Sequence, residues 1–220
     1  MSVGAAIFVK TPGLSPLKTR LAAAIGTAAA TAWYRAAAAA TGAVTQRVAT
    51  LAPYWAVAED PAASGSAWPG LPLLAQGAGD LGARMGRVHT MLVERHGAGL
   101  LLGADTPQLD PAVLARAAAW LDDPAPHLVM GPARDGGFWL IGANRLLDET
   151  AWTEAPCGTA ETAAGFRAAM AGAGAWLELP PLTDVDERAD LAPMLAELAQ
   201  LAAPLPAQQL LADASRAYIG

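Results

Sequence analysis

The chain has 220 residues, of which 54% are hydrophobic and 15% charged, so it is not disordered and can bury a sizeable core. Its formal net charge of -6 argues against general nucleic-acid binding, because a phosphate backbone requires a basic protein surface. No apolar run reaches the about 18 residues needed for a membrane span, and no secretory signal is evident, so we expect a cytoplasmic protein.

The cysteine and histidine content excludes several kinds of active site. A lone cysteine, Cys157, leaves no intramolecular disulfide and no cysteine-cluster zinc site, and a packed structural role is favoured for it. The three histidines share no motif spacing, and no serine-centred nucleophile elbow is present.

Near the N-terminus, a short apolar strand is followed by a cationic loop. Ala5–Val9 predicts a strand buried on both faces. Lys10, Lys18 and Arg20 follow within eleven residues of a chain that has 14 Lys and Arg. A strand–loop–helix junction presents free N–H groups to an anion, and these cations would add full charges. Leu17 replaces the glycine of a Walker A loop, so we predict a looser side-chain clamp, with a solvated basic loop as the alternative.

The rest of the chain alternates apolar strands and helices, with enough residues for one large α/β domain or two small ones. Further strands are expected at 54–58, 71–74, 99–102, 127–130, 138–141 and 176–179. Helices are expected over 27–50, from the mid-eighties to about 95, and over 110–121, 159–171, 190–203 and 207–218. The segment 152–157 is expected to be irregular.

A glycine-rich segment, Gln76–Met85, follows the expected third strand and opens a helix. Its glycines match the dinucleotide-binding pattern G-x-G-x-x-G at Gly77, Gly79 and Gly82. In a dinucleotide-binding unit, Asp105 at the end of the next strand would bind a ribose. The match is weak, because the chain has 22 glycines and because the pattern lies in the third strand–helix unit, whereas it usually opens the fold. Asp80 and Arg84, four residues apart, are candidates for an ion pair.

Carboxylates follow two other extended segments. The apolar run Gly99–Leu102 ends at Gly103, and Asp105 comes next, where a strand-end carboxylate can hold a divalent cation or merely start a turn. Asp184 and Asp186 are two residues apart, so an extended backbone places them on one face. That pair suits a metal, and it also suits the first turn of the following helix.

Paired glycines separate two apolar strands in the segment 131–142. Gly136 and Gly137 allow a sharp bend or the close approach of a flat ligand, and the Asp135-Gly136 pair is typical of a hairpin. A hairpin does not exclude ligand contact by Asp135.

Six ordered blocks of this sequence resemble one bacterial family over nearly the whole chain, to about Leu191. The blocks are Phe8-Val9-Lys10-Thr11-Pro12-Gly13, Lys18-Thr19-Arg20-Leu21, Gln76–Met85, Gly103-Ala104-Asp105-Thr106-Pro107, Gly131–Gly142 and Asp184-Val185-Asp186. They are similar to the GT-A-fold transferases labelled "rSAM/selenodomain-associated transferase 1", relatives of phospholactate and molybdenum-cofactor guanylyltransferases.

The resemblance implies a single nucleotide-diphospho-sugar transferase-like domain over 1–220, with three α/β/α layers and a mixed, mostly parallel sheet. Helices over about 192–220 would form a C-terminal extension, which leaves a homodimer open. Mg²⁺ or Mn²⁺ is the implied cofactor. The implied partners are a nucleotide or nucleotide-sugar donor and a small-molecule acceptor.

The candidate site residues form three groups. The metal ligands are Asp105, Asp184 and Asp186. The catalytic candidates are Lys10, Lys18, Arg20 and Asp135. The nucleotide-binding candidates are Val9, Gly13, Lys18, Arg20, Gln76, Gly77, Gly79, Asp80, Ala104 and Asp105.

Three functions remain open on this sequence. The first is transfer of a sugar from a nucleotide sugar, in which positioning and electrostatics suffice without a covalent nucleophile. The second is nucleotidyl transfer to a small phosphorylated or phosphonate acceptor. The third is a non-catalytic nucleotide-binding domain, and a dinucleotide-dependent oxidoreductase is an outside alternative.

Overall fold

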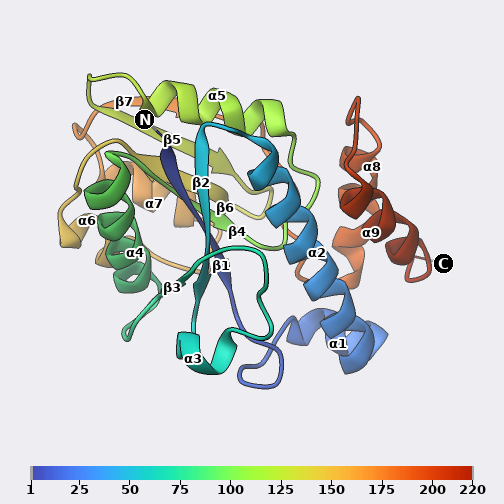
Figure 1. Cartoon of the computed structure of the whole chain (residues 1–220). Coiled ribbons are helices and arrows are strands. Elements are labelled where there is room, and N and C mark those ends of the chain that lie inside the picture. Colours follow the sequence, from blue (N-terminus) through green and yellow to red (C-terminus); the bar gives the residue numbers. More distant parts are fainter. Residues whose placement is uncertain (1, 220) are drawn as a thin grey trace.

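The computed structural model describes residues 2–219, and these form a mixed, mostly parallel sheet of seven strands (Figure 1). The strands are β1 (Val3–Val9), β2 (Leu51–Val57), β3 (Leu73–Ala75), β4 (Gly99–Gly103), β5 (His127–Pro132), β6 (Phe138–Ala143) and β7 (Ala175–Glu178). Their spatial order is β3-β2-β1-β4-β6-β5-β7, and β6 is antiparallel to both of its neighbours. The predicted fold class is confirmed.

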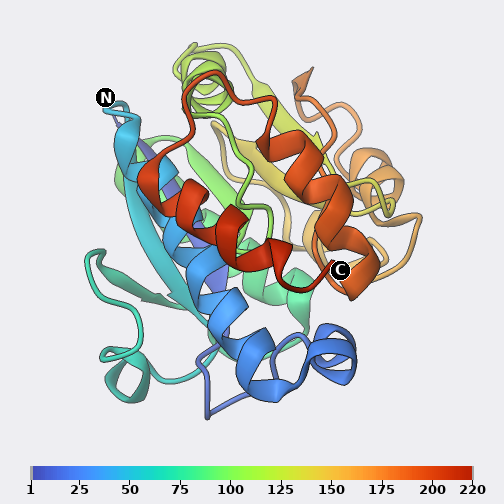
Figure 2. The ribbon, with the colours of Figure 1, turned by 90° about the vertical axis from the view of Figure 1, so that its right-hand side faces the viewer.

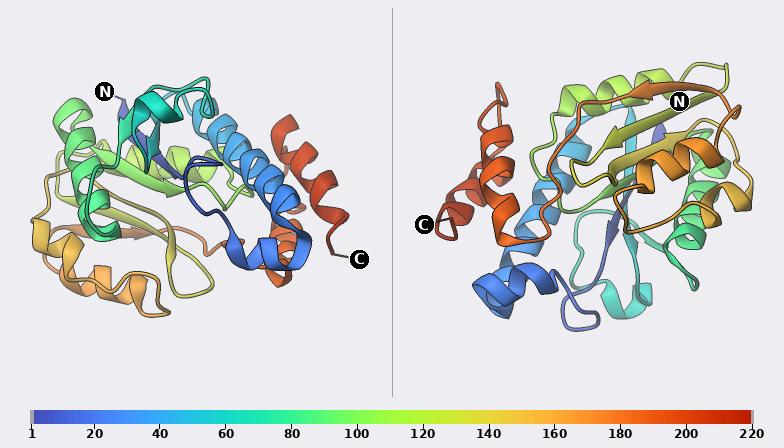
Figure 3. Two further views of the ribbon diagram at one scale, coloured as in Figure 1. Left: turned by 90° about the horizontal axis from the view of Figure 1, so that it is seen from below. Right: turned by 180° about the vertical axis from the view of Figure 1, so that it is seen from behind.

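Helices cover both faces of this sheet. They are α1 (Thr19–Ile25), α2 (Thr27–Arg47), α3 (Pro61–Ser64), α4 (Leu81–His96), α5 (Pro111–Leu121), α6 (Glu149–Thr153), α7 (Thr162–Ala169), α8 (Leu191–Leu198) and α9 (Pro206–Arg216), with a 3-10 turn, η1 (Arg188–Asp190). Figure 3 shows α4, α6 and α7 on one side and α2, α8 and α9 on the other. Among the described helices, none has both the length and the apolar character needed to cross a membrane.

The alternation of side chains along β1 explains the two layers. Ile7 and Val9 pack with α2 in one hydrophobic cluster, whereas Ala6 packs with α4 residues in the other. Successive residues of a strand point to opposite faces, so an apolar strand of this kind needs a helix on each side. Ile7 is completely buried, and shortening it to alanine would cost about 2–5 kcal/mol of stability.

The helix α4 is fixed at both ends and packs closely against α6. The Asp80 carboxylate accepts a hydrogen bond from the Ala83 N–H at 2.9 Å, and Gly97 ends the helix in a left-handed conformation. A Cβ on Gly82 would lie 2.2 Å from the Trp152 carbonyl oxygen, so this glycine permits the close approach. The prediction of an irregular segment from 152 was wrong at its start, because burial of Trp152 stabilises a helix too short to persist alone.

The C-terminal helices belong to the core of this chain. Figure 2 shows α9 running beside α2, and Leu211 is buried in the same hydrophobic cluster as Trp33. The Trp33 indole N–H donates to Ser215 Oγ at 3.0 Å. The face of α9 that packs on α2 is therefore already covered. The start of a C-terminal extension near residue 192 and the formation of a homodimer stay predictions.

Candidate functional site

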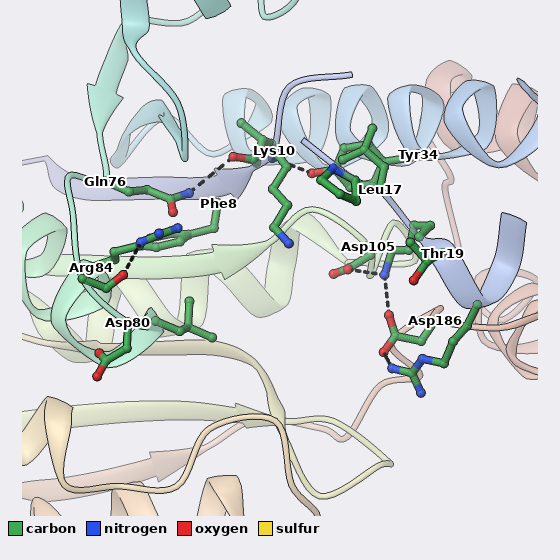
Figure 4. Close-up of a pocket in the computed structure, with 16 residues that line it drawn as sticks. Phe8, Lys10, Leu17, Thr19, Tyr34, Gln76, Asp80, Arg84, Asp105 and Asp186 are labelled. Carbon is green, nitrogen blue, oxygen red and sulfur yellow. Dashed lines mark hydrogen bonds and ion pairs between the residues drawn. The ribbon is translucent and has the colours of Figure 1, made fainter. Parts of the chain in front are cut away.

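An open cavity of about 570 Å³ lies where β1 and β4 end (Figure 4). The carboxyl edge of parallel strands is the usual place for ligands in open α/β sheets. The lining residues are Phe8, Val9, Lys10, Pro16, Leu17, Lys18, Thr19, Arg20, Tyr34, Gln76, Gly79, Asp80, Leu81, Arg84, Asp105 and Asp186. The chain contains two lysines, and both line this cavity.

The cationic loop after β1 is held by hydrogen bonds from its backbone to two side chains. The Lys10 N–H donates to Tyr34 Oη at 3.0 Å, and the Thr11 N–H donates to Glu59 Oε2 at 2.9 Å. Burial raises the pKa of Tyr34, so its phenol stays protonated at neutral pH. Within residues 2–219 the Lys10 ammonium makes no ion pair, and Figure 4 shows it in the middle of the cavity.

Lys18 precedes α1 in an unusual backbone conformation. Its φ of 40° and ψ of 50° are left-handed, and no other described non-glycine residue has a positive φ. Such a conformation costs about 1–2 kcal/mol for a residue with a Cβ. The side chain of Lys18 lines the cavity, as does that of Arg20 two residues later.

Lys18 and Arg20 bind the acidic residues at one end of the cavity. The Lys18 Nζ lies 2.5 Å from Asp105 Oδ2 and 2.8 Å from Asp186 Oδ1, and its side chain is 6% exposed. Arg20 pairs with the other oxygen of Asp186 from an exposed position. Two of the three cations predicted for a phosphate clamp, Lys18 and Arg20, therefore contact carboxylates predicted for a metal.

The pKa values of these groups reflect burial opposed by charge. Burial lowers the pKa of Lys18, but the three aspartates more than offset this and hold it above its usual value. Burial also works to raise the pKa of Asp105, yet the Lys18 ammonium keeps it below the usual range. Burial and the neighbouring Asp105 charge raise the pKa of Asp184 well above its ordinary value.

The acidic end has the donor set of a divalent cation site. Asp105, Asp184 and Asp186 each offer a carboxylate oxygen, and these oxygens lie within 4.8 Å of one another. Asp184 Oδ1 is buried and has no hydrogen-bond partner among the described residues. Mg²⁺ and Mn²⁺ favour oxygen ligands, so these residues fit either ion.

The loop that carries Asp184 and Asp186 is fixed by carboxylates from the C-terminal part of the chain. Glu197 accepts hydrogen bonds from the Thr183 N–H and from Gln108 Nε2, both at 2.9 Å. Asp190 Oδ2 accepts from the Asp186 N–H at 2.9 Å. The acids of the site are thus positioned by residues outside the predicted motifs.

The opposite end of the cavity is a backbone turn held in place by amide and guanidinium groups. Gly77 and Gly79 have φ values of 78° and 108°, a region that favours glycine. Gln76 Nε2 donates to the Val9 carbonyl at 3.3 Å, and Arg87 Nη1 donates to the Gln76 carbonyl at 2.6 Å. These contacts hold the turn from within the chain.

The ion pair expected between Asp80 and Arg84 is absent among the described residues, and the weak dinucleotide-binding alternative is not supported. Arg84 Nε donates to the Gly79 carbonyl at 2.9 Å and Asp80 caps α4, so the two side chains serve different partners. A dinucleotide-binding unit needs its glycine turn and its acidic residue on adjacent strands. Here β2 and β1 lie between β3 and β4, so Asp105 is not beside that turn.

Several predicted residues lie outside the cavity lining: Gly13, Gly77, Ala104, Asp135 and Asp184. Ala104 is buried, and Asp135 accepts a hydrogen bond from the Gly137 N–H at 2.9 Å in the turn between β5 and β6. That antiparallel pair confirms the predicted hairpin. Asp184 lies behind the lining, next to Asp105.

Sequence reasoning missed seven lining residues: Phe8, Pro16, Leu17, Thr19, Tyr34, Leu81 and Arg84. Four of them, Phe8, Leu17, Thr19 and Leu81, directly adjoin predicted site residues along the chain, which was the available signal. Tyr34 is different, because it lies in the middle of α2 and its spacing fits an ordinary core position.

The fold is that of nucleotide-diphospho-sugar transferase-like proteins. A candidate nucleotide-diphospho-sugar transferase from Desulfovibrio desulfuricans G20 is similar over 100% of this chain and 97% of its own, with a TM-score of 0.86 and 24% identity. CMP:2-keto-3-deoxy-manno-octonic acid synthetase in complex with CTP shares 15% identity over 91% of this chain and 99% of its own, with a TM-score of 0.57.

A third similar structure is the 4-diphosphocytidyl-2C-methyl-D-erythritol synthase of Anaerococcus prevotii DSM 20548. It has a TM-score of 0.54 and 9% identity over 90% of this chain and 95% of its own. No curated protein sequence matches the chain significantly. Residues 35–159, more than half of the chain, match the model of a bacterial family, and the chain belongs to this family, "Uncharacterized protein conserved in bacteria (DUF2064)".

Proposed function

We propose that this chain is a metal-dependent transferase that uses a nucleotide-activated donor, with a nucleotide sugar as the first candidate. The observation that carries the proposal is the cavity at the ends of β1 and β4, which is lined by the carboxylates Asp105 and Asp186 and by the cations Lys10, Lys18 and Arg20, with Asp184 next to the two carboxylates. A nucleoside diphosphate group needs both, since its charge is shared between a bound cation and protein cations. The order of the sequence motifs further suggests the narrower rSAM/selenodomain-associated group.

The roles follow from charge and position. Asp105, Asp184 and Asp186 would hold Mg²⁺ or Mn²⁺, which when bound supplies charge neutralisation at the diphosphate. Lys10, Lys18 and Arg20 would stabilise negative charge that develops on the leaving phosphate. Because these contributions are positioning and electrostatics, the chain needs no covalent nucleophile.

The remaining predicted residues are assigned to the two substrates. Gly77, Gly79 and Asp80 are proposed for the base and ribose. The others proposed to bind the nucleotide are Val9, Gly13, Gln76 and Ala104. Gly79 and Asp80 line the cavity, and the hydrogen bond from Arg84 Nε to the Gly79 carbonyl is exposed to solvent. A ligand can therefore reach this turn directly. Asp135 is proposed to face the acceptor from the hairpin turn.

Nucleotidyl transfer is the second candidate. Two proteins of similar fold support it: the CMP:2-keto-3-deoxy-manno-octonic acid synthetase, which was solved with CTP, and the 4-diphosphocytidyl-2C-methyl-D-erythritol synthase. Both names describe a product that contains a cytidine nucleotide. The same cationic loop can stabilise a pyrophosphate leaving group as well as a nucleoside diphosphate. The protein would then join a nucleoside monophosphate to a small phosphorylated or phosphonate acceptor.

The leaving group distinguishes the two chemistries. The purified protein is incubated with Mg²⁺, an acceptor panel and either nucleotide sugars or nucleoside triphosphates. Free nucleoside diphosphate supports glycosyl transfer, whereas pyrophosphate supports nucleotidyl transfer. Nucleotide binding without either product, and unaffected by removing the metal, would contradict both and favour a non-catalytic nucleotide-binding domain.

A further inference from the structure

The position between the acidic residues is held by a side chain of the protein itself. The Lys18 ammonium lies 2.5 Å from Asp105 Oδ2 and 2.8 Å from Asp186 Oδ1. In Figure 4 the dashed interactions join Asp105 and Asp186 through this one nitrogen. These two residues, together with Asp184, are the ones whose oxygens lie close enough to share a metal ion.

An ammonium and a divalent cation compete for these oxygens. The Lys18 side chain is 6% exposed, so its charge is stabilised there by the carboxylates and little by water. A cation bound by the same oxygens would stand next to the ammonium, and the repulsion between like charges at that distance is strong in a poorly solvated site. Metal entry therefore requires that the ammonium leave.

The displaced side chain has a place to go. Lys18 lines the cavity together with Lys10 and Arg20, and its flexible four-carbon stem can move the ammonium from the acids into this space. Its left-handed backbone is the kind of strained conformation that occurs at sites that switch between arrangements. In the cavity the ammonium would join Lys10, where an anionic ligand can contact both.

We infer that Lys18 is a built-in counter-cation of the acidic residues, which a divalent cation displaces, and that this displacement delivers Lys18 to the phosphates of the donor. The inference rests on the proposed function, since it assumes that the three aspartates bind metal. Linkage then requires that metal and phosphate ligand each increase the affinity for the other. Without metal, the phosphate clamp lacks Lys18.

The first test measures Mn²⁺ binding by titration in the absence of any nucleotide. Lys18→Met keeps an unbranched stem and removes the competing charge, so its Mn²⁺ affinity should exceed that of the wild type by about tenfold or more. The matched control is Lys10→Met, which removes a cavity cation that has no ion pair with the acids; its affinity should change by less than about threefold. Adding Asp105→Asn to Lys18→Met should abolish the gain.

The outcomes separate the inference from the function on which it rests. Equal Mn²⁺ affinity in the wild type and Lys18→Met overturns the displacement and leaves the metal site standing. Equal gains in Lys18→Met and Lys10→Met also overturn it, because general electrostatics would then explain both. No Mn²⁺ binding in any of these proteins overturns both the displacement and the proposed metal dependence.

A second measurement uses the wild-type protein, in case Lys18→Met does not fold. Since the chain contains two lysines, a spectrum of ¹⁵N-labelled lysine ammonium groups shows two signals, which Lys10→Met assigns. At Mg²⁺ concentrations that raise the melting temperature, the Lys18 signal should shift and exchange faster with water, while Lys10 changes little. A Lys18 signal that stays in place under those conditions overturns the inference.

Discussion

The two ends of the cavity are built in different ways. At the glycine end, Gln76 and Arg87 hold the turn through hydrogen bonds to backbone carbonyls, and the partners of Arg87 lie within 11 residues of it. At the acidic end, Lys18 pairs with carboxylates that are 87 and 168 residues away. Side-chain hydrogen bonds to backbone carbonyls fix the first end, whereas ion pairs at the second end can exchange their cation. The glycine end therefore supplies a fixed shape, and the acidic end can respond to charge.

The largest expected effect comes from the acidic end. Asp105→Asn removes the charge that follows β4 and that contacts Lys18, so Mn²⁺ binding and product formation should each fall by at least about 100-fold. The fold should survive, because asparagine has the same shape. Asp213→Asn, at an exposed position on α9, is the control and should leave both quantities unchanged. Retained activity in Asp105→Asn contradicts the assigned metal role.

The next effect tests whether helix α8 positions the acidic loop. Glu197→Gln replaces one of two acceptor oxygens by an NH2 donor, so either the Thr183 N–H and Gln108 or Arg134 loses its acceptor, and stability at pH 7 should fall by about 1–3 kcal/mol. Mn²⁺ affinity should fall as well, by about tenfold, because Thr183 adjoins Asp184. Denaturant unfolding and Mn²⁺ titration measure the two quantities. Glu94→Gln, an exposed change on α4, is the control.

The same variant has a predicted pH dependence. Burial works to raise the pKa of Glu197, but hydrogen bonds from Thr183 and Arg134 outweigh it and hold the pKa below its ordinary value of 4.5. A depressed carboxyl pKa stabilises the fold above the unfolded-state value, and this contribution is lost as pH falls through the folded-state value. The stability difference between wild type and Glu197→Gln should therefore shrink below about pH 4.5. A difference that is constant from pH 7 to 3 contradicts the ionic role.

A smaller effect is expected at the glycine end. Gly77→Ala places a Cβ 2.6 Å from Arg87 Nη1 at a φ of 78°, whereas Gly70→Ala has a similar φ of 87° and nothing within 4 Å. Both should lose about 1 kcal/mol of stability from the backbone. Only Gly77→Ala should also weaken nucleotide binding, and neither should change Mn²⁺ affinity. An altered Mn²⁺ affinity in Gly77→Ala would show that the two ends are not independent.

The smallest expected effect is at the hairpin. Asp135→Asn keeps an oxygen that can accept from the Gly137 N–H, so stability should change by less than about 0.5 kcal/mol. A role toward the acceptor would appear as a lower rate at unchanged Mn²⁺ and nucleotide affinity. Unchanged kinetics would remove Asp135 from the site.

Much of this fold follows from local pattern. The sequence predicted β1 and β4, because strands that are buried on both faces appear as continuous apolar runs. It also predicted Asp105 as a site residue, because parallel strands end at the same edge of a sheet. The convergence of Asp184 and Asp186 with Asp105 was also predicted, and their oxygens do lie within 4.8 Å of one another. Their roles in binding stay predictions.

Contacts that depend on the direction of a side chain could not be predicted from the sequence. Asp80 and Arg84 have the spacing of a helical ion pair, but Asp80 is the N-cap, where its carboxylate turns toward the Ala83 N–H. Tyr34 has the spacing of a core residue, and only the folded chain shows its hydroxyl oxygen accepting from the Lys10 N–H. The contact of Lys18 with the acids depends on a left-handed backbone that no propensity predicts.

If the acidic end binds nucleotide through a divalent cation, nucleotide affinity must depend on both the metal and Asp105. Calorimetric titration of a nucleoside diphosphate into the wild-type protein and into Asp105→Asn, each with Mg²⁺ and with a chelator, measures this dependence. We expect Mg²⁺ to strengthen binding to the wild type by about tenfold or more and to leave the affinity of Asp105→Asn unchanged. Equal affinity for the nucleotide with and without Mg²⁺ in the wild type would contradict it.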